Sequence, residues 1–149
     1  MSLQEKINTE LKNAMIAKDA DKLTVIRSLK SALKYSAIEK KVDTLSDLDA
    51  LQVIQKQIKQ RRESIDQFQK AGRNDLSDKE LIEVAVLETF LPRQMSDADL
   101  ETLVRNEAQA AGASTKKDFG RMMKLLTEKV QGQADSKRVS EVLGKILVV

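Results

Sequence analysis

Basic side chains near the C-terminus are the residues of this chain best suited to bind a ligand. They are Lys116, Lys117, Arg121, Lys124, Lys137 and Arg138. On a helix, Lys117, Arg121 and Lys124 cluster on one side, and apolar residues fall on the other. Ammonium groups hold phosphates as point charges and guanidinium groups hold them as planar forks, so the pattern is typical of a nucleic-acid-binding surface. The alternative interpretation is the solvated face of an amphipathic helix.

Two charged residues fall among apolar residues on helices predicted for the first part of the chain. Arg61 projects into the arc that holds Ile58 and Ile65, and Glu88 lies beside Val84. A buried charge needs a partner, because removing it from water is costly. We therefore predict a buried structural ion pair, in which Arg61 meets Glu88 or another carboxylate at the helix interface. An anion-binding role for Arg61 in a pocket is the alternative.

The sequence contains no histidine and no cysteine. Without them there is no disulfide, no thiolate or imidazole metal site, no cysteine nucleophile and no histidine general base. The glycine-rich phosphate loops and the metalloprotease motif HExxH are absent as well. Oxygen-ligand metal binding and carboxylate, lysine or tyrosine chemistry remain open, but no spacing of such residues indicates them. We therefore predict no catalytic residue, no metal and no cofactor.

The net charge of +3 hides a segregation of charge along the chain. Residues 18–41 carry seven basic and three acidic side chains, residues 56–73 six and two, and residues 116–149 eight and four. Residues 75–88 are acidic, with five acidic side chains and one basic. The blocks either pair with one another inside the fold or display separate basic and acidic faces.

Hydrophobic spacing predicts an all-α protein. One proline and five glycines are too few to punctuate many short strands. The predicted helices before Pro92 cover residues 2–17, 21–39, 46–71 and 77–91, and three shorter ones follow it, starting near Ser96, Thr115 and Asp135. This boundary predicts an N-terminal four-helix domain, residues 1–92, and a small C-terminal three-helix domain, residues 96–149.

The sequence also predicts the start and burial of the fourth helix and suggests a reason for two glycines inside helices. The fourth helix is predicted to begin at Ser77, with Glu80 completing a capping box, and to be buried because it is apolar almost all round. Gly120 and Gly144 fall inside predicted helices, where each costs about 1 kcal/mol relative to alanine. Close helix–helix packing is the favoured reason, and a ligand contact by exposed backbone is the alternative.

Several segments resemble the YqeY family. They are IRSLKSALKYSAIEK (26–40), KQIKQRRESIDQFQKAGR (56–73), EVAVLETFLPRQMSDADL (83–100) and DFGRMMKLLTEKVQGQADSKRVSEVL (118–143). The resemblance extends over essentially the whole chain and is specific in combination. The C-terminal half is also similar to the tail domain of the B subunit of aspartyl/glutamyl-tRNA amidotransferase.

The resemblance implies an all-α protein with a larger N-terminal and a small C-terminal helical domain. In the amidotransferase the tail domain contacts tRNA, and the amidation chemistry lies elsewhere. We therefore predict a bacterial, cytoplasmic, non-catalytic protein that binds tRNA phosphates, or an accessory protein of an aminoacyl-tRNA synthetase or amidotransferase. The alternatives are an amidotransferase-like carbon–nitrogen ligase that uses glutamine as amide donor, and a protein-interaction adaptor.

No membrane partner is expected. No uncharged apolar run approaches the ~20 residues that a membrane-spanning helix needs. Charges also begin too early in MSLQEKINTELK for a signal peptide.

Overall fold

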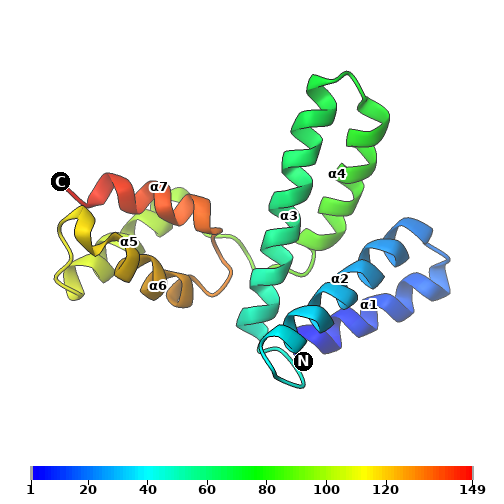
Figure 1. Cartoon of the computed structure of the whole chain (residues 1–149), viewed down its shortest axis with the longest axis horizontal. Coiled ribbons are helices and arrows are strands. Elements are labelled where there is room, and N and C mark those ends of the chain that lie inside the picture. Colours follow the sequence, from blue (N-terminus) through cyan, green and yellow to red (C-terminus); the bar gives the residue numbers. More distant parts are fainter. Residues whose placement is uncertain (1, 149) are drawn as a thin grey trace. The chain divides into compact units, whose positions relative to one another are not determined.

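The computed structural model describes residues 2–148 (Figure 1). Over these residues it contains α-helices, one short 3₁₀ helix and no strand, and a single isolated parallel bridge joins Thr115 to Val148. The prediction of an all-α fold is confirmed.

The chain divides after Leu91 into two compact units. The first holds α1 (Leu3–Ala17), α2 (Ala20–Glu39), α3 (Asp47–Lys70) and α4 (Asn74–Glu88). The second holds α5 (Asp97–Ala110), the 3₁₀ helix η1 (Lys116–Asp118), α6 (Phe119–Val130) and α7 (Ser136–Ile146). Folding of the predicted domains as independent bodies stays a prediction.

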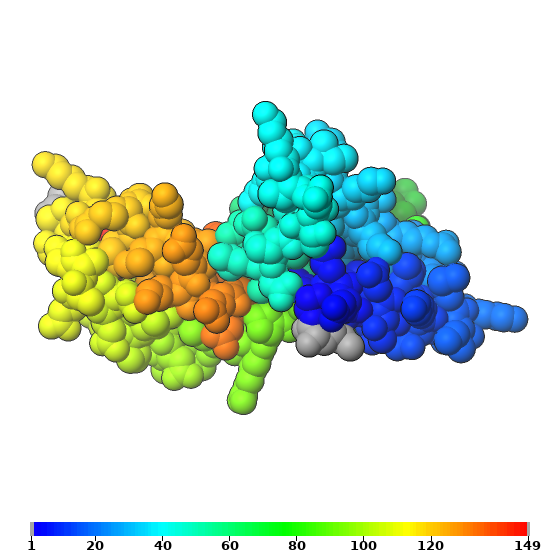
Figure 2. Space-filling view, turned by 90° about the horizontal axis from the view of Figure 1, so that it is seen from below, coloured from blue at the N-terminus to red at the C-terminus, as the bar shows by residue number. Residues whose placement is uncertain are grey.

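Two helical hairpins make up the first unit. α1 and α2 lie side by side at the surface, dark and light blue in Figure 2, and α3 packs along α4. The start of α1 is fixed by the expected capping box, in which the Ser2 hydroxyl accepts from the Glu5 N–H and the Glu5 carboxylate accepts from the Ser2 N–H. At the end of α3, Gly72 has φ +71°, a conformation that glycine adopts at little cost.

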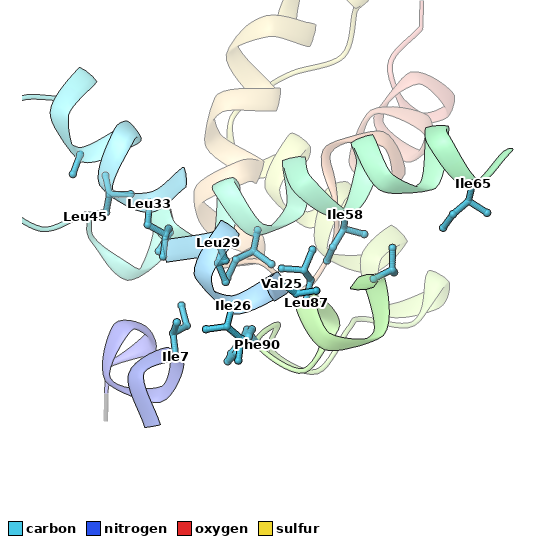
Figure 3. Packing of buried hydrophobic residues seen from close by; sticks show 14 residues of the cluster. Ile7, Val25, Ile26, Leu29, Leu33, Leu45, Ile58, Ile65, Leu87 and Phe90 are labelled. Atoms are coloured by element: carbon cyan, nitrogen blue, oxygen red, sulfur yellow. The ribbon is translucent and has the colours of Figure 1, made fainter. Parts of the chain in front are cut away.

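The apolar stripes of all four helices meet in one core (Figure 3). Ile26 and Leu29 of α2, Ile54 of α3 and Leu87 of α4 are completely buried there. Each such side chain contributes about 1.5–3 kcal/mol by leaving water, so this core holds the unit together.

The start of α4 differs from the prediction. The helix begins at Asn74 instead of Ser77, and Ser77 is a buried residue inside it whose hydroxyl donates to the Asn74 carbonyl oxygen at 3.1 Å. The turn at Gly72 is short enough for α4 to start directly after Arg73. The predicted capping box is therefore wrong, and Glu80 is free to face α3.

The exposure of α4 also differs from the prediction. Leu81 is 43% exposed and Ile82 is 49% exposed, although the helix was expected to be buried on all sides. The reason is that, within the first unit, α4 packs against α2 and α3 on one side, and Leu81 and Ile82 lie on the other side. An apolar face is left open to solvent.

In the second unit, α5, α6 and α7 enclose a separate core. Leu100, Met122, Leu126 and Leu143 are completely buried in it. The Thr115–Val148 bridge closes one end of the unit: the Lys116 N–H donates to the Val148 carbonyl oxygen at 2.9 Å, and the Val148 N–H donates to the Ser114 carbonyl oxygen at 2.9 Å. This pairing brings η1 and the residues after α7 together.

The two helical glycines of this unit are exposed. No atom lies within 4 Å of the position that a Cβ would take at Gly120 or at Gly144. The explanation by close helix–helix packing is therefore wrong, because an alanine would meet no neighbour at either position.

Candidate nucleic-acid interface

Arg138, one of the six predicted phosphate-binding residues, forms hydrogen bonds within the second unit. Its guanidinium donates to the Met95 carbonyl oxygen at 2.7 Å and to the Asp97 carboxylate at 3.0 Å. The side chain is half-buried, and it ties the first turn of α7 to the segment that enters α5. Both contacts are donated by Nη2, and the Asp97 carboxylate offsets the charge of Arg138.

Arg121 is also engaged. It donates to the Ala111 carbonyl oxygen at 3.2 Å and to the Asp118 carboxylate at 3.0 Å. Asp118 in turn accepts from the backbone N–H groups of Ser114 and Thr115. The hydrogen bond from Arg121, followed by these backbone donors, holds the pKa of Asp118 below its ordinary value of 3.8. Asp118 is thus ionised at neutral pH and offsets the charge of Arg121.

The four lysines of the predicted set behave differently. Lys116, Lys117, Lys124 and Lys137 are exposed, and none of them forms an ion pair with a described residue. Their ammonium groups are therefore available to an anion from solution.

The structure does not gather these lysines at one point. α6 and α7 are joined by a short turn and pack against each other, so Lys137 in the first turn of α7 lies far from the Thr115–Val148 bridge. At 1.5 Å per residue, α7 separates these two ends by roughly 16 Å. Lys116 and Lys117 lie at the bridge, and Lys124 lies midway along α6.

Both exposed glycines lie at the bridge end of the unit. Gly120 is in the first turn of α6, and Gly144 is in the last turn of α7. We call the group formed by Lys116, Lys117, Gly120, Gly144 and Lys145 the glycine–lysine end. Lys145 is not in the predicted set, because nothing in the sequence reveals that the end of α7 meets η1. The Thr115–Val148 bridge is what brings these two segments together.

The charged residues of the α3–α4 hairpin form a different pairing from the one predicted first. Arg61 meets Glu83, and Glu80 at 3.4 Å, whereas Glu88 meets Arg62 at a more exposed position. Arg61 and Glu83 each lie 11 residues from Gly72, so an antiparallel hairpin turning at Gly72 places them opposite each other. Arg61 therefore meets another carboxylate at the helix interface, and the pairing with Glu88 is not formed.

An anion-binding role for Arg61 finds no support in this geometry. The Arg61 and Glu83 side chains are 19% and 11% exposed, so their charges offset each other with little solvent between them. Arg61 also lines a small pocket of about 250 Å³, but Glu80 lines it as well. The pocket therefore has no excess of positive charge.

The described residues form neither a metal-binding cluster nor a membrane-spanning helix. No group of three or more acidic side chains is close enough to hold a metal ion in that part of the chain. None of its helices combines the length and apolar character needed to cross a bilayer.

Similarity to a known protein family extends over nearly the whole chain. The family described as "Yqey-like protein" matches residues 4–147. The chain belongs to the YqeY family. The resemblance noted from the sequence motifs is thereby confirmed.

Relatives of this YqeY-family chain occur in fungi. The protein named "Altered inheritance of mitochondria protein 41, mitochondrial" from Eremothecium gossypii is 39% identical over 85 residues, which are 57% of this chain and 46% of that protein. The protein of the same name from Kluyveromyces lactis is 31% identical over 140 residues, 94% of this chain and 66% of that protein. The one from Pyrenophora tritici-repentis is 30% identical over 148 residues, 93% and 80%. This chain thus spans about half the length of the first of these relatives.

These relatives correct two predictions. We predicted a bacterial and cytoplasmic protein, but the matched relatives are fungal and are named as mitochondrial. Membership of the YqeY family therefore implies neither a bacterial source nor a cytoplasmic location, and both predictions are wrong.

Proposed function

We propose that this YqeY-family chain is a non-catalytic accessory protein that binds tRNA through the second unit. The observation that carries the proposal is the set of exposed lysines without an ion pair among the described residues: Lys116, Lys117, Lys124 and Lys137. The similarity of this half to the amidotransferase tail domain, which contacts tRNA, supports the same assignment.

The two exposed glycines add a second argument. Each lowers the stability of its helix by about 1 kcal/mol relative to alanine, and nothing within the unit fills the space that glycine leaves. A helix surface without Cβ atoms lets a ribose–phosphate chain approach the backbone closely. We therefore place the strongest tRNA contact at the glycine–lysine end, where Lys116, Lys117 and Lys145 supply positive charge.

Recognition would depend on the backbone and shape of the RNA. The chain has only four aromatic residues, one tyrosine and three phenylalanines. Phe90 is buried in the first core and Phe119 packs against the second, so stacking on bases would contribute little. With about four phosphate contacts, the logarithm of the binding constant should fall with the logarithm of salt concentration with a slope of about −3.

A titration of labelled tRNA with the full chain across salt concentrations tests the proposal. In the triple variant Lys116→Glu, Lys117→Glu, Lys124→Glu, the affinity should fall by about tenfold or more, because attraction to phosphates becomes repulsion. The matched control reverses Lys12, Lys18 and Lys59, three exposed lysines of the first unit. It changes the net charge equally and should alter the affinity less than about threefold.

Three results would contradict the proposal. They are no tRNA binding at low salt, an affinity that does not depend on salt, and equal losses in the two triple variants. Nothing among the described residues favours the ligase alternative.

A further inference from the structure

A groove runs along the first unit between α1, α2 and the segment that follows α2. Its volume is about 590 Å³, within the range of pockets that hold ligands. Ile7 of α1, Leu33 and Ala37 of α2, and Leu45 form its floor (Figure 3 shows Ile7, Leu33 and Leu45). The groove is therefore lined by the edge of the hydrophobic core.

The rim of the groove exposes further apolar side chains. Ile38 is 66% exposed and Val42 is 45% exposed, and Tyr35 lies one turn before Ile38 on α2. Leaving such surface in water costs about 25 cal/mol per Å². None of these three residues belongs to the buried cluster of the first unit or to the partly buried residues packed against it.

The two long edges of the groove differ in charge. The α1 edge presents the neutral side chains Gln4 and Asn8, whereas the α2 edge presents Lys30 and Lys34. Both lysines are exposed, and neither forms an ion pair with a described residue. Asp43 is the carboxylate of the described lining, and it belongs to the segment after α2. The complementary occupant has an apolar face and a negative charge that meets the α2 edge.

This chain itself contains a surface of that kind. The outer side of α4 exposes Leu81, Ile82 and Ala85, and Asp78 lies one turn before them on the same side. Asp78 is exposed and forms no ion pair with a described residue. Leu81 and Ile82 belong to the helix that was predicted to be buried because it is apolar almost all round.

We propose that the groove of one copy of this chain binds the outer face of α4 of a second copy. Leu81 and Ile82 would enter the groove and cover Ile38 and Val42, and Asp78 would approach Lys30 and Lys34. RNA fits the groove less well, because phosphates would meet the lysines and leave the apolar rim in water. If each pair of copies shares a single groove–α4 contact, further copies can add to form an open assembly. If two copies exchange this contact reciprocally, they close into a twofold dimer.

Sedimentation equilibrium of the full chain over a range of concentrations tests the proposal. Wild type should associate reversibly, with a dissociation constant in the micromolar range, as is common for small interfaces. Ile38→Glu places a charge in the groove and Ile82→Lys places one on α4, and each variant alone should be monomeric. The control Ile16→Glu changes a residue of α1 that is 82% exposed and does not line the groove, so it should associate like wild type.

Mixing the two variants gives the sharpest result. The Ile82→Lys chain retains an intact groove, and the Ile38→Glu chain retains an intact α4 face, so an equimolar mixture should form mixed dimers through one contact. Circular dichroism should show that all variants keep the helical content of wild type, since the altered side chains are exposed.

The proposal is overturned if wild type is monomeric at every concentration, which would leave the groove to another partner. It is also overturned if Ile16→Glu weakens association as much as Ile38→Glu does, or if nuclease treatment abolishes association. Loss of tRNA binding in the second unit has no bearing on these outcomes, because the groove and α4 both belong to the first unit.

Discussion

Arg61 links α3 to α4 through two carboxylates, so the effect of removing it depends on the charge that it leaves behind. In Arg61→Leu, Glu83 would stay mostly buried without a cation, and we expect the free energy of unfolding to fall by about 3 kcal/mol. Urea denaturation measures this change. The double variant Arg61→Leu, Glu83→Leu should recover much of the loss, because two apolar side chains can pack at the same interface.

The neighbouring pair provides the control for this prediction. Arg62 and Glu88 are both largely exposed, so Arg62→Leu should cost less than about 1 kcal/mol. Equal losses at Arg61 and Arg62 would show that burial does not govern these pairs.

Asp118 makes the stability of the second unit depend on acid pH. Its pKa in the folded chain is lowered, first by Arg121 and then by two backbone donors. The stabilisation is therefore fully present above the ordinary pKa of 3.8 and is lost as the pH falls through the lower folded value. Asp118→Asn should destabilise the chain at pH 7, and its difference from wild type in thermal midpoint should shrink at the acid end. A difference that stays constant as the pH falls would rule out this ionic contribution.

At the scale of the helix, a substitution at Gly144 should have opposite effects on the stability of the protein and on its affinity for tRNA. Gly144→Ala should raise the free energy of unfolding by about 1 kcal/mol, because alanine favours the helix and meets no neighbour. The same methyl group should weaken tRNA binding if the RNA backbone approaches the helix there. Chemical denaturation and the tRNA titration measure the two effects on one protein.

Asn106→Ala is the control for that helix substitution. Asn106 is exposed on α5, and alanine there should raise stability by up to about 0.7 kcal/mol without changing the affinity for tRNA. Unchanged affinity in both variants would show that Gly144 does not contact the RNA.

The helices themselves were largely predictable from the sequence. Periodic apolar residues and local caps such as Ser2 with Glu5 determine them within a few neighbouring positions. The start of α4 was missed because the residue after Gly72, Arg73, occupies the cap position without a capping side chain. The open face of α4 was missed because helical periodicity reports that a residue is apolar and does not report whether a neighbouring helix is present to cover it.

The candidate site was less predictable than the fold. Residue types identified basic side chains, and the pairing of Arg121 with Asp118, three residues before it, is a local contact that helical spacing allows. Arg138, however, is held by Met95 and Asp97, which lie more than 40 residues earlier in the chain. Likewise, Lys145 joins Lys116 only through the pairing of Thr115 with Val148. Long-range pairings of this kind leave no periodic signal in a single sequence.

For the whole molecule, the two proposed surfaces belong to different units and should act independently. At a protein concentration below that of self-association, Ile38→Glu should leave the affinity for tRNA unchanged, because the lysines of the second unit are untouched. The Lys116→Glu, Lys117→Glu, Lys124→Glu variant should in turn sediment like wild type. Loss of both activities in either variant would show that they share one surface.

The bridge between Thr115 and Val148 also provides the molecule with two built-in reporters. The amide protons of Lys116 and Val148 are held in backbone hydrogen bonds, although both residues lie outside the α-helices. Deuterium can replace them only when this end of the unit opens, so their exchange rates measure that opening directly. A ligand that binds this end in its closed form should slow the exchange of both amides together. A ligand that binds elsewhere on the second unit should not change the exchange rates of these two amides relative to the rates of the amides in the core of that unit.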